Sequence, residues 1–256
     1  MRHMPRKRFG QNFLIDPYII AKIVAEISPQ KDDRVIEIGP GLGALTKPLL
    51  QQLDHLAVIE IDRDIVAQLK ILFSPDKLTI YATDALKFDF SSLGNQLRIV
   101  GNLPYNISTP LLFHLSQYSE NILDMHFMLQ KEVVQRLTAK PGISDYGRLS
   151  VMMQYHFNMT HAFNVLPQSF SPAPKVDSAI IEMIPRPQKN KSAHDEALLS
   201  QIVLAAFSQR RKTLRNTLQQ YLTADDFNRI GIDSKVRAEN LSVENFVAIT
   251  NLCHSK

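Results

Sequence analysis

The sequence predicts an α/β fold in which a mostly parallel sheet, covered by helices on both faces, precedes a small all-helical domain. Three observations predict it: short apolar runs alternate with helical stretches after Pro29, a glycine-rich turn follows the first of these runs, and strand patterns stop near Pro185. Near-continuous apolar strands alternating with helices are typical of a parallel sheet. With 256 residues, of which 45% are hydrophobic, the chain can bury a core without disulfides or metal ions.

The first helix is expected to begin at Asp16-Pro17, because Asp can cap free amide groups and Pro suits the first helical position. The strand-and-helix pairs expected next are 34–38 with 45–53, 56–61 with 65–73, 78–83 with a connection, 98–100 with 111–115, and 125–129 with 133–137. Segments 161–166 and 179–184 have no helical pattern between them, so we expect a closing antiparallel hairpin there.

A linker rich in proline and lysine, residues 185–191, marks the expected domain boundary. Residues 1–186 then form the sheet domain, and residues 187–256 form the helical domain. The expected helices of the second domain are 198–207, 213–222, 225–230 and 243–252. Thr223 and Ser242 are the expected caps of the last two helices.

The excess of positive charge in the chain lies at its two ends. The formal net charge is +4 over residues 1–31, −4 over residues 32–185 and +4 over residues 186–256. A solvated surface is the ordinary explanation of any one basic run. Two basic ends around an acidic middle favour a polyanionic partner, of which nucleic acid is the commonest.

Metal binding is not expected from the sequence. Cys253 is the single cysteine, which excludes an intramolecular disulfide, and there is no spaced cluster of Cys and His. Asp62 and Asp64 have the spacing of a metal-binding pair, but a predicted helix begins there. We therefore expect these two residues to cap that helix.

Signal peptides and membrane spans are not expected either. Gly10, Gln11 and Asn12 interrupt the basic N-terminal segment where a signal peptide would be apolar. The longest stretch without Asp, Glu, Lys or Arg, residues 149–174, contains many polar residues and prolines. A cytoplasmic protein without membrane association is the expectation.

A glycine-rich turn, Gly39-Pro40-Gly41-Leu42-Gly43, directly follows the first predicted strand. Glycines let the backbone turn sharply and lie close to a ligand, although a dinucleotide fingerprint or a plain strand–helix turn would also fit. Glu60 ends the next strand, where a carboxylate can bind ribose hydroxyls, and Asp84 ends the third, where one can accept from an adenine amino group. Because the carboxyl ends of parallel strands share one edge, these residues together favour an adenosine-containing ligand.

The fourth predicted strand of the sheet ends in Asn102-Leu103-Pro104-Tyr105. Proline holds Leu103 extended and fixes the direction of its carbonyl. The Asn102 side-chain oxygen and a nearby backbone carbonyl can both accept from one exocyclic amino group, which leaves its nitrogen more tetrahedral and more nucleophilic. Tyr105 offers a flat face on which a base can stack. An X-Pro-aromatic turn without function is the alternative, but the position beside the cofactor edge favours methyl transfer to an aromatic amine.

These motifs resemble those of class I S-adenosylmethionine-dependent methyltransferases, which have a Rossmann-like fold. Segments 8–14, 145–150 and 170–178 narrow the resemblance to the ribosomal RNA adenine dimethyltransferases, in particular to the bacterial enzymes that act on the small subunit. The resemblance implies a seven-stranded sheet, S-adenosyl-L-methionine as methyl donor and S-adenosyl-L-homocysteine as product. It also implies dimethylation at N6 of two adjacent adenosines in a loop near the 3′ end of small-subunit ribosomal RNA, during late subunit assembly.

The resemblance assigns roles to individual residues. It implies cofactor binding by Asn12, Leu14, Gly39, Gly41, Glu60, Asp84 and Asn102. It implies catalytic roles for Asn102, Leu103, Tyr105 and Phe170. The Phe170 ring would stack on the target adenine from the side opposite Tyr105, although a lone Phe in such a loop is more often a packing residue.

RNA affinity is expected to come chiefly from contacts between cations and phosphates. The candidate residues are Arg6, Lys7, Arg8, Lys175, Arg210, Arg211, Lys212 and Arg215. Residues 209–216 are the strongest group, expected on little more than two helical turns, with a solvated helix end as the alternative. The expected partner is the RNA of the immature small ribosomal subunit. No exposed apolar heptad stands out, so we expect a monomer.

Two other functions fit part of the sequence. An NAD(P)-dependent oxidoreductase would explain the glycine-rich turn and Glu60, but nothing in it requires the Asn102–Tyr105 segment. A ribosome-assembly or nucleic-acid-binding factor without turnover would explain the basic ends. The intact acceptor motif favours an enzyme over such a factor.

Overall fold

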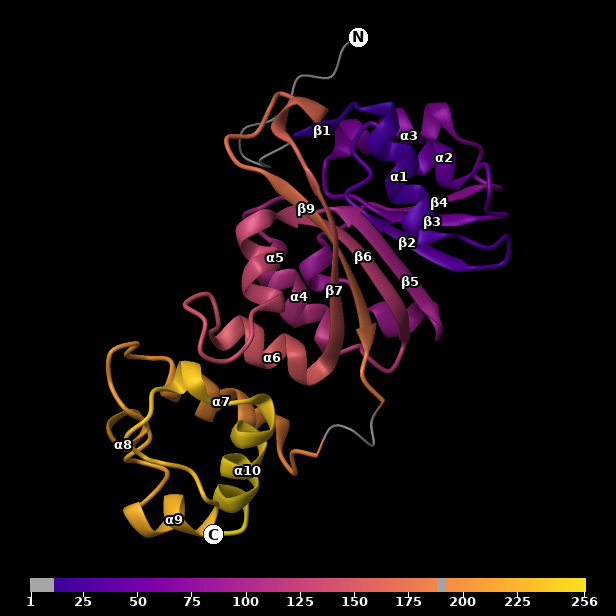
Figure 1. The fold of residues 1–256 in the computed structure, drawn as a ribbon. Helices are drawn as coiled ribbons and strands as arrows, with labels where there is room; N and C mark the ends of the chain where they lie inside the picture. The colour runs from indigo at the N-terminus through magenta and orange to yellow at the C-terminus, as the bar shows by residue number, and fades with distance from the viewer. Residues whose placement is uncertain (1–11, 188–191) are drawn as a thin grey trace. The chain divides into compact units, whose positions relative to one another are not determined.

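The computed structural model describes residues 12–187 and 192–256, which form two compact units (Figure 1). The first unit combines the chain up to Val134 with Met159–Pro185, and the second combines Gln135–Asn158 with Arg186–Lys256. One limit between the units therefore lies next to the boundary predicted after residue 186. The sequence patterns gave no indication that residues 135–158 belong with the C-terminal helices.

A seven-stranded sheet organises the first unit. Its strands are β2 (Arg34–Ile38), β3 (Leu56–Ile59), β4 (Leu78–Tyr81), β5 (Leu97–Asn102), β6 (Ile122–Gln130), β7 (Phe157–Val165) and β9 (Ser178–Pro185). Their order is β4-β3-β2-β5-β6-β9-β7, in which β4, β3, β2, β5 and β6 are parallel and β9 is antiparallel to β6. The prediction of a mostly parallel, seven-stranded sheet is confirmed.

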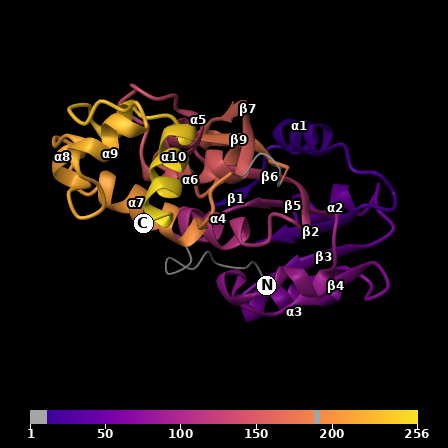
Figure 2. The same cartoon turned by 90° about the horizontal axis from the view of Figure 1, so that it is seen from below.

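Helices cover both sides of this sheet. On one side lie α1 (Pro17–Ile27), α2 (Thr46–Leu49) and α3 (Arg63–Leu72), whose buried residues join those of the strands in one apolar cluster. α4 (Ser108–Ser116) lies on the side opposite α1 (Figures 1 and 2). α5 (Lys131–Thr138) follows β6. Short 3-10 helices occur at Ala85–Lys87, Phe90–Leu93, Pro167–Ser169 and Ala238–Asn240.

Side-chain caps begin several of these helices where the sequence predicts them. Asp16 accepts from the amides of Tyr18 and Ile19 at the start of α1. Asp62 accepts from the amide of Asp64 at the start of α3, which confirms the expected capping role. The predicted helix 45–53 is much shorter than expected, since only the four residues of α2 are helical.

Three further elements, two short strands and one helix, have no counterpart in the sequence predictions. β1 (Phe13–Leu14) pairs with β8 (Phe170–Ser171) in a small antiparallel sheet of its own. α6 (Arg148–His156) forms in a stretch without a clear apolar period. A strand of two residues exists only through its pairing with a distant segment, so local patterns do not reveal it.

The second unit is helical, as predicted. α7 (Glu196–Ala206) packs against α6, α8 (Leu214–Thr217) and α10 (Val243–His254), and α9 (Ala224–Arg229) precedes α10 in the chain. Thr223 and Ser242 cap α9 and α10 in capping boxes. Across the two described ranges, none of the helices combines the length and apolar character needed to cross a bilayer.

The structure corrects the prediction of a basic helix over residues 209–216. Arg210, Arg211 and Lys212 lie in the turn between α7 and α8, and only Arg215 of the four cations is helical. The physical reason is local: α7 ends at Ala206, and the run of polar and charged residues that follows has no apolar side chain to hold it against the unit.

Candidate functional site

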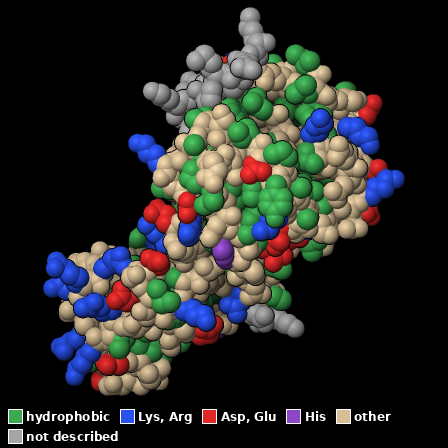
Figure 3. All heavy atoms as spheres, turned by 45° about the horizontal axis from the view of Figure 1, so that its top comes forward, with side chains coloured by type: hydrophobic (Ala, Val, Ile, Leu, Met, Phe, Trp, Pro, Cys, Tyr) green, Lys and Arg blue, Asp and Glu red, His purple; other side chains and the backbone are tan. Residues whose placement is uncertain are grey.

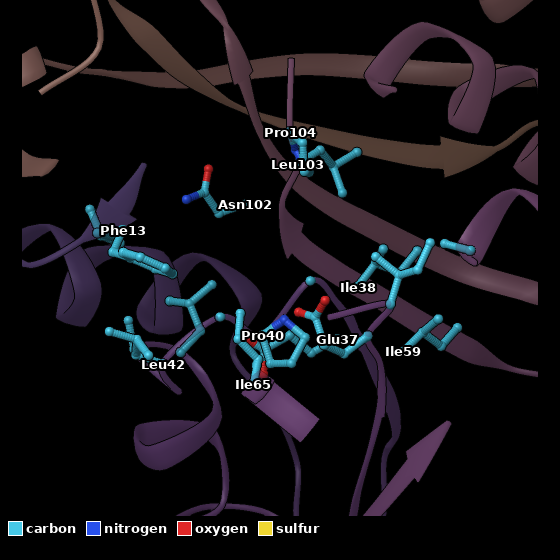
Figure 4. Close-up of a pocket in the computed structure, with 18 of the residues that line it drawn as sticks. Phe13, Glu37, Ile38, Pro40, Leu42, Ile59, Ile65, Asn102, Leu103 and Pro104 are labelled. Carbon is cyan, nitrogen blue, oxygen red and sulfur yellow. The ribbon is translucent and has the colours of Figure 1, made fainter. Parts of the chain in front are cut away.

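A cavity of about 510 Å³ opens at the carboxyl edge of the sheet (Figure 4). Its walls come from β1, from the turn after β2, from the ends of β3 and β4, and from the segment after β5. Apart from β1, these segments lie at the carboxyl ends of parallel strands. This is the edge at which open α/β sheets bind ligands.

The glycine-rich turn forms the floor of this cavity. Gly39 and Gly41 have φ angles of +68° and +54°, a region that side chains with a Cβ rarely adopt. The Gly39 amide donates to the carbonyl of Ile59 at 3.0 Å, which fixes the turn to the end of β3. The Phe13 ring lies 3.2 Å from the place that a Cβ on Gly41 would occupy. The predicted need for glycine at this turn is therefore met in the structure.

The two acids predicted at the strand ends both line the cavity. Glu60 is 7% exposed, and its carboxylate accepts from the Asp62 amide at 2.8 Å. Burial raises the pKa of Glu60, although hydrogen bonds from neighbouring backbone amides act in the opposite direction. Asp84 accepts from the Leu86 amide at 3.0 Å. The structure thus brings together two carboxyl groups that the sequence places on separate strands.

Asn102 is the last residue of β5, and its side chain lies at the cavity between Phe13 and Leu103 (Figure 4). Its Nδ2 donates to the carbonyl of Asn12 at 3.1 Å. This contact makes Oδ1 the acceptor that the Asn102 side chain offers to a ligand. The side-chain amide of Asn102 is therefore held by the backbone through its nitrogen.

Leu103 and Tyr105, in the rest of this segment, are held by hydrogen bonds to other strands. Leu103 is 1% exposed, and its amide donates to the Met128 carbonyl at 3.2 Å. The hydroxyl groups of Tyr105 and Ser178 share a hydrogen bond of 2.8 Å. Burial raises the pKa of Tyr105, with a smaller opposite effect from Ser178. A neutral, anchored phenol is therefore the state of Tyr105 at neutral pH.

Phe170 lies in a different environment from the one that the family resemblance implies, and matches the packing role that the sequence left as the alternative. Its side chain is 4% exposed and belongs to the apolar cluster that also contains Leu14, its partner across β1 and β8. It is not among the residues that line the cavity. The structure does not bring the rings of Phe170 and Tyr105 together at the site, because the pairing of β8 with β1 directs Phe170 into the core.

Sequence reasoning missed Glu37, which lines the cavity and is 2% exposed. Its Oε2 accepts from the Thr46 hydroxyl at 2.6 Å, and burial raises its pKa to about 7 despite that hydrogen bond. The signal was present, since a carboxyl side chain interrupts the apolar part of β2 two residues before the glycine-rich turn. Within the described part of the chain, no three His, Cys, Asp or Glu side chains are grouped as metal ligands would be.

The basic residues predicted to bind RNA have exposed side chains where the structure describes them. These are Lys175, Arg210, Arg211, Lys212 and Arg215. Arg210 also donates to the carbonyl of Ser144 in its own unit. Figure 3 shows Lys and Arg side chains gathered over the helical unit in that view. Arg6, Lys7 and Arg8 lie outside the described residues.

Comparisons with known proteins agree on one family. The sequence model of the family described as "Ribosomal RNA adenine dimethylase" matches residues 2–255. The "Ribosomal RNA small subunit methyltransferase A" of Nitrosospira multiformis is 61% identical over 251 residues, which are 98% of this chain and 97% of that protein.

Solved structures agree with the sequence match. A dimethyladenosine transferase from Plasmodium falciparum is 26% identical with a TM-score of 0.80, covering 93% of this chain and 95% of that one. The 23S rRNA methyltransferase ErmE has the same fold at 22% identity, with a TM-score of 0.70 over 95% of this chain and all of that one. The fold is that of class I methyltransferases, and the oxidoreductase alternative has no support. A single family model spanning nearly the whole chain, together with relatives of this identity and coverage, shows that the chain belongs to the ribosomal RNA adenine dimethylase family.

Proposed function

We propose that this chain uses S-adenosylmethionine to dimethylate N6 of two adjacent adenosines in a loop near the 3′ end of small-subunit ribosomal RNA. One observation carries the proposal: the Asn102–Tyr105 segment opens onto the same cavity as the glycine-rich turn, Glu60 and Asp84. A methyl donor and an acceptor base can therefore meet in one place. The names of the full-length relatives support small-subunit RNA as the substrate.

The cavity suits an adenosine-containing cofactor in size and charge. Its volume of about 510 Å³ lies within the range of sites for small molecules. Glu60 would bind the ribose hydroxyls and Asp84 the adenine amino group. Side chains that carry or can acquire negative charge also complement a sulfonium cation. The contacts along the methionine end are assigned to Asn12, Leu14, Gly39 and Gly41.

The acceptor segment would activate the target amine by geometry and not by a strong base. Asn102 Oδ1 and the Leu103 carbonyl accept from the two N6 hydrogens, so the nitrogen lone pair is drawn away from the ring. S-adenosylmethionine, when bound, would supply an electrophilic methyl carbon, and transfer of that methyl group to N6 would leave the electron pair of the broken C–S bond on sulfur. The surplus proton leaves N6 for solvent after transfer. A second round with a fresh cofactor gives dimethyladenosine.

Stacking would hold the base during these two rounds. Tyr105 offers one face, and its hydroxyl is fixed by Ser178. Base–aromatic stacking contributes about 1–3 kcal/mol per base. Stacking on Phe170 remains part of the proposal, and it requires that side chain to leave the apolar cluster when RNA binds. RNA must also present the adenine outside a helical stack.

The proposed partner is the immature small ribosomal subunit, bound by a monomer in the cytoplasm without a metal ion. Residues 187–256 would supply most phosphate contacts, because they carry a formal net charge of +3. The proposed contacts are Arg6, Lys7, Arg8, Lys175, Arg210, Arg211, Lys212 and Arg215. Phosphate contacts position the RNA, while the cavity selects the base.

The decisive experiment incubates the protein with methyl-labelled cofactor and separated ribosomal subunits, then maps modified nucleosides by mass spectrometry. Dimethyladenosine at two adjacent small-subunit positions is the expected product. Glu60→Ala should reduce methyl transfer at least a hundredfold, because the cofactor would no longer be oriented for reaction by its ribose. Binding of the subunit should remain intact. Glu120→Ala, at an exposed glutamate outside the cavity, is the matched control. Label found only in large-subunit RNA, or full activity of Glu60→Ala, would contradict the proposal.

A further inference from the structure

The small sheet of β1 and β8 joins two segments that are far apart in the sequence. Phe13 pairs with Ser171 and Leu14 with Phe170. The ladder continues beyond the two strands, because the Ile15 amide donates to the Ser169 carbonyl at 2.9 Å. The segments 13–15 and 169–171 are therefore held along their whole length.

Both segments lead back to the Asn102–Tyr105 motif. On one side, the carbonyl of Asn12 accepts from Asn102 Nδ2 at 3.1 Å. On the other side, the chain after β8 reaches Ser178, whose hydroxyl group is bonded to that of Tyr105. The β1–β8 sheet thus closes a ring of contacts that begins and ends in the acceptor motif.

Asp16 ties this sheet to the body of the unit with its two carboxylate oxygens. Oδ1 accepts from the amides of Tyr18 and Ile19, and so caps α1. Oδ2 accepts from the Ser169 hydroxyl at 2.9 Å. Ser169 is 4% exposed and Asp16 is half-buried, so the Ser169 hydroxyl is enclosed while the carboxylate keeps some contact with solvent. One side chain thereby fixes both the start of a helix and the residue that precedes β8.

We propose that Asp16 is a positioning residue for methyl transfer, which acts through Ser169 by holding β8 on β1. The wall of the cavity formed by β1 and the segment that leads to Tyr105 are then fixed as one piece. Asp16 itself is not among the residues that line the cavity. The inference rests on the proposed function, and it adds a residue and a role that the cofactor and base contacts do not include.

Loss of this hydrogen bond should misalign the cavity wall and the acceptor motif relative to each other. The backbone ladder remains, so the unit should stay folded, but the ring of contacts through the acceptor motif becomes looser. Reaction rates fall steeply when reacting atoms are misplaced by a fraction of an ångström to one ångström. The loss should therefore appear mainly in kcat, with a smaller change in the dissociation constant of S-adenosylhomocysteine.

Two substitutions separate this role from capping. Ser169→Ala removes the hydroxyl and leaves the cap of α1 intact. Asp16→Ser keeps a good N-cap but is too short to reach Ser169. Each should lower kcat about tenfold, equivalent to about 1.4 kcal/mol, and the double variant should lose little more than either one. Ser169→Thr, which keeps the hydroxyl, should restore most of the activity.

Thermal unfolding, measured on every variant, separates alignment from stability. Ser116→Ala is the matched control, because Ser116 is similarly buried at 8% exposure and its hydroxyl donates to the Phe113 carbonyl. Its kcat should equal that of the wild type. A wild-type kcat in folded Ser169→Ala, or additive losses in the double variant, would overturn this inference alone. An inactive wild type would refute the proposed function and this inference with it.

Discussion

Glu37 shows how a single residue can make the cavity sensitive to charge. Its carboxyl group is buried, and burial, with a smaller repulsion from Glu60, raises its pKa to about 7. Because the pKa in the folded state exceeds the usual 4.5, this group favours the folded state fully below pH 4.5. That contribution is lost as the pH rises through about 7. A cation bound nearby acts in the opposite direction, since it favours the ionised carboxylate.

Cofactor binding should consequently release protons near pH 6.5. Calorimetric titration with S-adenosylmethionine in buffers of different ionisation enthalpy measures the number released. Glu37→Gln keeps the hydrogen bond from Thr46 possible but cannot ionise, so the number should fall. An unchanged proton count in Glu37→Gln would show that its carboxyl group stays protonated, or is already ionised, in both states.

At the scale of strands and helices, the edge that bears the site could be predicted because its signals are local. Each strand is read from an apolar run, and each functional acid comes at the end of one. The close approach of β2 and β5 depends on a further local signal, Gly101, since a Cβ there would lie 2.5 Å from the Ile38 carbonyl. The partner against which Phe170 packs could not be predicted, because it depends on the pairing of β8 with a strand of two residues.

The amino ends of the parallel strands lie opposite the site. There Arg98 of β5, which is 8% exposed, holds several elements together. Its guanidinium group donates to the Ile27 carbonyl at the end of α1 at 2.6 Å, to Asp33 at 2.6 Å and to Asp124 of β6 at 2.8 Å. Burial alone would raise the pKa of Asp124, but contacts with His126 and Arg98 outweigh it and hold that pKa below its usual value. One cation therefore links a helix end and two strands.

Asp124→Asn should lower the free energy of unfolding by about 2 kcal/mol at pH 7, because a charged partner of Arg98 is lost. Since the pKa of Asp124 is depressed in the folded state, its contribution is present above the usual pKa of 3.8 and is lost as the pH falls through the lower folded value. The difference between wild type and variant in urea unfolding should therefore shrink below pH 3.8. Asp54→Asn is the control, because Asp54 forms an exposed ion pair with Lys31. Equal effects of both substitutions at pH 7 would contradict the assignment.

For the whole molecule, sequence patterns identified two kinds of structure but not the full membership of each unit. The linker near Pro185 is visible because its composition changes abruptly. The grouping of residues 135–158 with the C-terminal helices depends on packing of α6 against α7 and α10, which no local period encodes. The basic cluster was recognised from its composition, but the helix predicted for it was wrong. A run of charged residues carries no information on whether tertiary contacts will stabilise a helix.

The turn that carries Arg210, Arg211 and Lys212 should supply a salt-dependent part of RNA binding. Each phosphate contact contributes about 0.7–0.9 to the slope of log affinity against log salt concentration, so replacing all three with Ala should flatten that slope by about 2.1–2.7. Cofactor affinity should not change, because none of the three lines the cavity. Replacement of the exposed Lys31, Lys70 and Lys77 by Ala removes the same charge from the first unit and controls for net charge. Filter binding across a salt series measures both, and equal slopes for the two triple variants would assign the effect to net charge and not to this turn.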